Sequence, residues 1–153
     1  MERGSRIIVV GFGNELLPGD ACGKRVVEEL SGCVEARWLG RGVQALIHLL
    51  PKYDVVFAVD ASRRVEPGAV RITALKPGDC EAGELSSLHE AGLLDAACMA
   101  LEVAESLGRK PLVYLVECGV RDPLDASQAE PAIREAVRLI LERVGGCQSA
   151  SKS

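Results

Sequence analysis

Asp20, Asp60 and His89 carry side chains suited to chemistry, and each comes just past the carboxyl end of a predicted β-strand. Loops at the carboxyl ends of parallel strands converge, so these side chains should meet at one edge of a sheet. Two carboxylates and one imidazole can bind a divalent transition metal and leave coordination positions open. They can also deprotonate and orient a water molecule. The combination therefore favours one functional site, which could bind a metal ion or activate a water molecule.

Each of these residues also has a structural interpretation when it is taken alone. Asp20 lies just before a helix and fits an N-terminal cap. Asp60 ends a buried strand and could cap a turn with Ser62, while His89 fits an exposed loop histidine. His48, the other histidine, lies in a helical pattern of apolar residues and is assigned a structural role. Only the three together favour a functional site.

The elements that must position these residues alternate between strand-like and helix-like segments. Strands are predicted near residues 6–11, 34–39, 54–60, 70–75 and 112–118, and helices near 26–30, 43–50, 94–108 and 131–144. Such alternation predicts an α/β three-layer sandwich, with a mostly parallel twisted sheet and helices on both faces. The strand at 70–75 should be antiparallel, because the connection before it is too short for a parallel crossover.

The chain of 153 residues has the length of one ordinary domain. We expect a single α/β domain over residues 1–147 and a disordered tail over 148–153. The segment 76–88 contains glycine and serine and few apolar anchors, so it is predicted to be a mobile loop that helps to grip a partner.

Composition excludes several classes of partner. The formal net charge of −4 argues against nucleic acid, which needs a basic face. No apolar run reaches the roughly 18 residues that a membrane-spanning helix requires. The amino terminus lacks the apolar stretch of a signal peptide. We therefore expect a cytoplasmic protein without membrane insertion. A monomer is a separate expectation, which composition does not test.

The six cysteines, at positions 22, 33, 80, 98, 118 and 147, have no zinc-site or thioredoxin-type spacing. Free cysteines are among the most buried residues, so most of them are interpreted as small core residues. Disulfides are the alternative, which would fit a hyperthermophilic source.

The glycine-rich loop after the first strand does not fit a nucleotide site well. In a dinucleotide-binding loop, the third glycine would stand at Leu16. In a P-loop, a serine or threonine would stand at Arg25.

The ordered set of residues is similar to the hydrogenase maturation protease family. Its first signature is a strand followed by G-x-G-N-x-L-x-x-D-[DE]-G-x-G, matched here by Gly11, Gly13, Asn14, Leu16, Asp20 and Gly23. The second is an Asp at the end of the third strand, here Asp60. The third is Ser-x-His-x-x-Gly-Leu, which residues 87–93 match and which contains His89. The resemblance runs from about residue 6 to residue 145.

The resemblance implies a peptidase that removes the C-terminal extension of a nickel–iron hydrogenase large-subunit precursor. In the family, the residues matching Asp20, Asp60 and His89 contact the metal. The nickel is contributed by the substrate, and no organic cofactor is implied. Gly19 replaces the first acid of the usual pair, Ala21 replaces a glycine and Cys22 adds a thiol, so metal preference stays open.

Several mechanisms and functions remain open at this point. Asp20 or Asp60 could act as general base on a water, or the two carboxylates could share a proton. A cysteine nucleophile at Cys22 or Cys118 is a third route. The functional alternatives are a non-catalytic metal-checking chaperone of the same fold, which Gly19 leaves open, and a nucleotide-binding domain.

Overall fold

The computed structural model describes residues 4–76, 79–80 and 91–147. The predicted tail over 148–153 lies outside these residues. So does almost all of the loop 76–88 that was predicted to be mobile, and so does His89.

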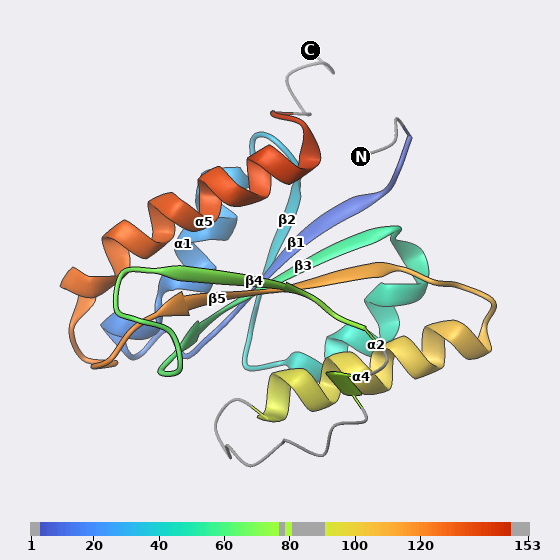
Figure 1. The fold of residues 1–153 in the computed structure, drawn as a ribbon, viewed down its shortest axis with the longest axis horizontal. Coiled ribbons are helices and arrows are strands. Elements are labelled where there is room, and N and C mark those ends of the chain that lie inside the picture. Colours follow the sequence, from blue (N-terminus) through green and yellow to red (C-terminus); the bar gives the residue numbers. More distant parts are fainter. Residues whose placement is uncertain (1–3, 77–78, 81–90, 148–153) are drawn as a thin grey trace.

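Five strands form one sheet, with helices packed on both of its faces. The elements are β1 (Ile7–Phe12), α1 (Cys22–Leu30), β2 (Glu35–Gly40), α2 (Leu46–Leu49), β3 (Val55–Ser62), β4 (Val70–Ala74), α4 (Ala91–Ser106), β5 (Leu112–Gly119) and α5 (Ala129–Val144). Figure 1 shows α1 and α5 above the sheet and α2 and α4 below it. This arrangement confirms the predicted three-layer α/β sandwich.

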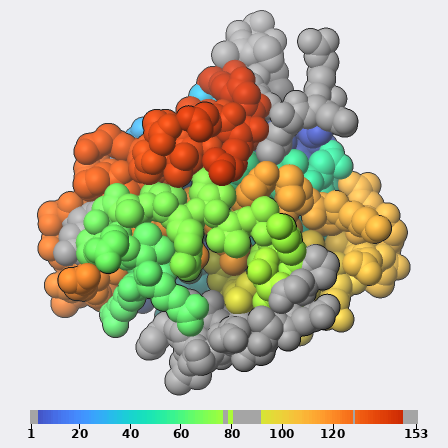
Figure 2. Space-filling view, viewed as in Figure 1, coloured from blue at the N-terminus to red at the C-terminus, as the bar shows by residue number. Residues whose placement is uncertain are grey.

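The strand order is β2-β1-β3-β5-β4. Strands β2, β1, β3 and β5 pair in parallel, and β4 pairs antiparallel with β5. The antiparallel strand predicted after the short turn is therefore confirmed. Strand β4 forms an edge of the sheet, and in Figure 2 the green segment that contains it covers the molecule between α5 and α4.

Strand β3 shows how the sequence creates two cores from one sheet. Val55, Phe57 and Val59 point into the core under α1 and α5, whereas Val56 and Ala58 point into the core over α2 and α4. Side chains alternate between the faces of a strand, so a strand covered on both sides must be apolar at every position. This explains the unbroken apolar run at residues 55–59.

The predicted helix over 43–50 is shorter than expected. Helix α2 contains only Leu46–Leu49, with a 3-10 turn on each side. Pro51 lies in the second turn, Leu50–Lys52. Its nitrogen has no proton to donate and its ring would clash with the preceding helical turn, so the α-helix ends before it. Within the described ranges, no helix is both long enough and apolar enough to cross a membrane.

All six cysteines form disulfides, so the interpretation of most of them as free core residues is wrong. The pairs are Cys22–Cys118, Cys33–Cys147 and Cys80–Cys98. Two of these bonds join residues 96 and 114 positions apart in the sequence. Such pairings depend on the fold and cannot be deduced from cysteine spacing.

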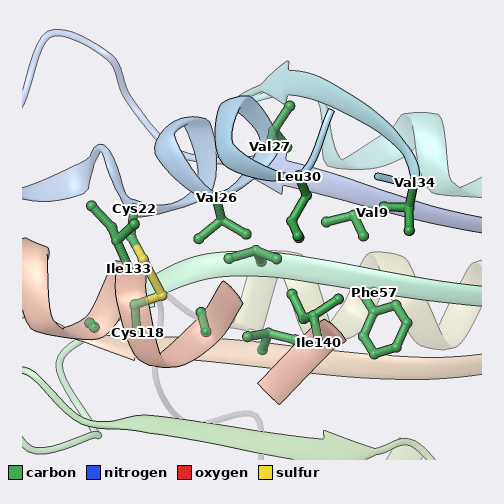
Figure 3. Packing of buried hydrophobic residues seen from close by; sticks show 14 of the residues in the cluster. Val9, Cys22, Val26, Val27, Leu30, Val34, Phe57, Cys118, Ile133 and Ile140 are labelled. Atoms are coloured by element: carbon green, nitrogen blue, oxygen red, sulfur yellow. A yellow bond between two sulfur atoms is a disulfide. The ribbon is translucent and has the colours of Figure 1, made fainter. Parts of the chain in front are cut away.

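Two of the disulfides lie at opposite ends of helices α1 and α5. Cys22 is the first residue of α1 and bonds to Cys118 near the end of β5. Both are fully buried, and Figure 3 shows the bond in the core near Ile133. Cys33 follows α1 and bonds to Cys147, which follows α5, at the other end of these helices.

Gly11 and Gly23 let α1 approach β1 more closely than any other residue would allow. A Cβ atom on Gly11 would lie 2.3 Å from the carbonyl oxygen of Gly23. A Cβ on Gly23 would lie 2.5 Å from the carbonyl oxygen of Phe12 and 2.9 Å from that of Val59. These contacts are with backbone atoms, so a larger residue would push α1 away from the sheet.

We therefore expect Gly23→Ala to destabilise the protein. Forcing a methyl group into a packed interior typically costs about 1–3 kcal/mol, and here it has no flexible neighbour to displace. Gly32→Ala is the matched control, because nothing lies within 4 Å of a Cβ at Gly32. Urea unfolding of the oxidised proteins measures both changes. Equal midpoints for Gly23→Ala and the wild type would contradict the close contact.

Candidate active site

A pocket of about 580 Å³ lies at the edge of the sheet where β1, β2, β3 and β5 end, here called the carboxyl edge. Its walls come mainly from the loops that follow these strands. The lining residues are Phe12, Gly13, Asn14, Leu17, Gly19, Asp20, Gly40, Arg41, Val43, Asp60, Ala61, Ser62, Arg63, Arg64, Gly92, Leu93, Val120 and Pro123. Pockets of this size commonly hold small ligands or short peptide segments.

Asp20 lies in this wall at the end of the 3-10 turn Pro18–Asp20, immediately before α1. Its Oδ2 atom accepts the backbone N–H of Asn14 at 2.5 Å. Its own N–H donates to the carbonyl oxygen of Leu17 at 2.9 Å. The carboxylate is therefore not an N-terminal cap bonded to α1. It ties the loop after β1 together and faces the pocket.

The Asp20 carboxyl is held at a higher pKa than usual because it is partly buried. Desolvation penalises the charged form. The hydrogen bond from Asn14 and the positive charge of Arg41 both lower the pKa, but burial outweighs them. A carboxylate with a raised pKa is a stronger base, which suits it to take a proton from water.

Asp60 lies near the end of β3 and lines the same pocket. It is half-buried, and its Oδ1 accepts the N–H of Ala61 at 2.8 Å. In the alternation of β3, Asp60 follows Val56 and Ala58 on the face that carries α2 and α4. The structure thus brings the two predicted carboxylates into the wall of one pocket.

Two glycines allow the loop after β1 to lie close to neighbouring backbone segments. A Cβ on Gly13 would lie 2.5 Å from the carbonyl oxygen of Asp20. A Cβ on Gly19 would lie 2.5 Å from the carbonyl oxygen of Asp122, and the Gly19 N–H donates to the carbonyl oxygen of Pro123 at 2.6 Å. No side chain fits at position 19, which gives a physical reason for the glycine where the signature has an acid.

No family model matches the sequence, and no curated protein matches it. Solved structures do match. A hydrogenase 2 maturation peptidase from Thaumarchaeota archaeon SCGC_AB-539-E09 is 31% identical over 92% of this chain and 98% of its own, with a TM-score of 0.66. This chain belongs to the hydrogenase maturation peptidases.

Other family members share the fold at lower identity. The hydrogenase maturating endopeptidase HybD from E. coli is 24% identical, with a TM-score of 0.69 over 94% of this chain and 95% of its own. The [NiFe] hydrogenase maturation protease HybD from Thermococcus kodakarensis is 18% identical, with a TM-score of 0.69 over 90% of this chain and 98% of its own. The family assignment made from the signatures is therefore confirmed, together with the fold.

Most residues of the family's first signature now have a structural role. Gly11 and Gly23 allow α1 to approach β1, Gly13 makes room for the Asp20 backbone, and Asn14 donates to Asp20. Leu16 differs, because it is highly exposed and contributes nothing to either core.

The third predicted metal contact, His89, lies outside the described residues. In the part of the chain that the structure describes, no three His, Cys, Asp or Glu side chains gather as a metal-binding group. The predicted cluster of three residues therefore stays a prediction.

The sequence analysis missed Arg41, which brings a positive charge into the pocket of this peptidase. It follows the end of β2 and acts electrostatically on Asp20. The rule that selected Asp20 and Asp60, a polar side chain after a strand end, applies equally to Arg41. An arginine neither binds metal nor moves protons at neutral pH, so its residue type gave no such signal.

The structure also excludes one of the three mechanisms considered from the sequence, the cysteine nucleophile. Cys22 and Cys118 are bonded to each other and fully buried. Catalysis by cysteine requires a thiolate, which a disulfide does not supply. The route through a cysteine nucleophile is therefore wrong for the oxidised protein.

Proposed function

We propose that this chain is an endopeptidase that removes the C-terminal extension of a nickel-loaded nickel–iron hydrogenase large-subunit precursor. Membership of the maturation peptidases supports a role in hydrogenase maturation. The observation that carries the proposal is the placement of Asp20 and Asp60 in the wall of one pocket at the carboxyl edge. A pocket with two carboxylates can receive a peptide segment and activate water beside it.

Asp20, Asp60 and His89 contact the nickel, which arrives with the substrate. Oxygen and imidazole ligands suit nickel and leave coordination positions for groups of the precursor. The metal thereby places the scissile segment beside the carboxylates. An unloaded precursor lacks this contact and is cleaved poorly, so the same residues check metal loading and perform hydrolysis.

The chemistry is that of an aspartic-type general base. The Asp20 carboxylate takes a proton from water while the oxygen of that water attacks the scissile carbonyl carbon. The carbon–nitrogen bond then breaks, and the leaving amine takes up the proton that was removed from the water. Arg41, which lines the same pocket, offsets negative charge that develops on the carbonyl oxygen. Asp60 shares the site and can hold the proton between steps.

The partner in this proposal is the large-subunit precursor, and neither nucleic acid nor membrane insertion takes part. The protein works in the cytoplasm as a monomer. Three disulfides in a cytoplasmic protein fit a hyperthermophilic host, where intracellular disulfides are common.

A cleavage assay tests the proposal. The purified protein is incubated with nickel-loaded precursor and with the same precursor lacking nickel, and intact mass reports loss of the extension. We expect rapid loss from the loaded form only. Stable binding to the loaded precursor without any cleavage would instead support a metal-checking chaperone of the same fold.

A further inference from the structure

Two leucines beside the pocket are among the most exposed large apolar side chains of the described residues. Leu16 is 84% exposed and Leu124 is 68% exposed. Leu16 lies in the loop between β1 and α1, and Leu124 lies in the loop between β5 and α5. An exposed leucine adds nothing to the stability of the fold, because burial is the source of hydrophobic stabilisation.

These two loops adjoin each other at the wall of the pocket. The Gly19 N–H in the first loop donates to the carbonyl oxygen of Pro123 in the second at 2.6 Å. Leu17 and Pro123, the chain neighbours of Leu16 and Leu124, both line the pocket. The two leucines therefore lie on two adjoining loops at the rim of the pocket that Asp20 and Asp60 line.

The backbone holds both leucines in place. The Leu16 N–H donates to Asn14 Oδ1 at 3.0 Å, and the Leu124 N–H donates to Asp122 Oδ1 at 2.9 Å. Asn and Asp side chains fix tight turns in this way. Side chains carried on fixed loops lose less conformational entropy on binding, which favours their use as anchors in an interface.

We infer that Leu16 and Leu124 form a docking surface for the folded large-subunit precursor, next to the segment that enters the pocket. The inference rests on the proposed function for the identity of the partner. The surface adjoins the pocket. A precursor whose peptide segment lies beside Asp20 and Asp60 must therefore contact this rim. The precursor presents an apolar patch there, which covers both leucines and positions the extension for cleavage.

Kinetics of the double variant Leu16→Ser/Leu124→Ser test the docking surface. Serine keeps both backbone hydrogen bonds and adds no charge beside Asp20. Loss of a buried leucine contact weakens binding by about tenfold, so KM for the nickel-loaded precursor should rise by at least that factor. The value of kcat should stay unchanged, because the lost contacts are made equally before and during the reaction.

Leu107→Ser is the matched control. Leu107 is 63% exposed but follows α4, at the opposite edge of the sheet. It should leave KM, kcat and the melting temperature unchanged. The double variant should also melt with the wild type. An unchanged KM in a folded double variant would overturn the docking surface. If the wild type is a dimer and the double variant is a monomer with the same KM, the leucines form a dimer interface instead, and the docking surface is wrong.

Direct binding separates this inference from the proposed function. The precursor is passed over immobilised wild-type protein and over both variants, and the dissociation constant is measured. If the wild type binds the precursor but does not cleave it, the peptidase proposal fails and weaker binding by the double variant still supports docking. If the wild type does not bind the precursor, or binds it no better than the double variant, the docking surface is wrong.

Discussion

Asp20→Asn and Asp60→Asn should each lower cleavage of the nickel-loaded precursor by about 10²–10⁴-fold, the usual contribution of a general base. Asparagine has nearly the same shape as aspartate, but it cannot take a proton from water. It is also a weaker ligand for a divalent cation, because it carries no charge. His89→Ala should weaken recognition of the nickel, since it removes the proposed imidazole contact.

The Asp20 variant should remain folded. The amide oxygen of asparagine can accept the N–H of Asn14 as Oδ2 of Asp20 does now. Burial raises the pKa of Asp20, so its ionised form costs folding free energy. This cost is complete above the raised pKa, declines as the pH falls through it, and is absent below the pKa of the unfolded chain. Asn removes the cost at every pH. The melting temperature at pH 7 should therefore be equal to that of the wild type or higher.

Asp54→Asn is the control for these substitutions. Asp54 also accepts a backbone N–H, from Arg6 at 2.7 Å, but it lies just before β3 at the opposite edge of the sheet. It should not change cleavage. The measurements are initial rates from intact mass, together with thermal melts. Near wild-type rates in folded Asp20→Asn and Asp60→Asn proteins would show that the assigned site is wrong. If His89→Ala alone stays active, the carboxylates perform the chemistry and the histidine only tunes recognition of the metal.

The sequence predicted the fold because its signals were local. The apolar run of β3, the Pro-Gly turn before β4 and the helix-ending pair Gly145 and Gly146 each act within a few residues. Asp20 and Asp60 were found by the same logic, since both were placed at the carboxyl ends of predicted strands. Because the carboxyl ends of parallel strands meet at one edge of a sheet, this position predicted that the two carboxylates lie close together.

What the sequence could not show depends on residues far apart in the chain. The pairing of Cys22 with Cys118 exists only because the fold brings the start of α1 close to the end of β5. The reason for Gly19 is the backbone of residues 122 and 123, more than a hundred positions away. The exposure of Leu16 was hidden as well, because a leucine between apolar segments is ordinarily expected in the core.

Removing the disulfide between Cys22 and Cys118 should cost both stability and activity. The bond closes a loop of 96 positions. Loss of a bond across about 100 residues is expected to lower the free energy of unfolding by about 4–5 kcal/mol. That is a large part of the roughly 5–15 kcal/mol that stabilises a typical domain.

The activity should fall because this bond holds the two segments that carry the carboxylates. Cys22 lies two positions after Asp20, and Cys118 pairs in register with Ala61, the residue after Asp60. A misplacement of about 1 Å can cost about a hundredfold in rate. We expect kcat of Cys22→Ala/Cys118→Ala to fall by at least about tenfold at a temperature where the variant is fully folded.

The disulfide between Cys33 and Cys147 provides the matched control. It closes a loop of similar length, 114 positions, so the expected loss of chain entropy is nearly the same. It lies at the other end of α1 and α5, away from the pocket. Cys33→Ala/Cys147→Ala should therefore lose a comparable contribution from chain entropy and retain its kcat.

A variant that refills the core distinguishes the effect of the covalent bond from the effect of core packing. Cys22→Ala/Cys118→Val restores much of the lost volume where Val26 and Ile133 pack, and it should recover part of the stability but not kcat. Thiol titration of the unfolded, unreduced wild type should find no free thiol, and six after reduction. Free thiols in the unreduced protein would refute the pairing itself. Equal kcat values in both double alanine variants would show that the bond near the pocket stabilises the fold without positioning Asp20.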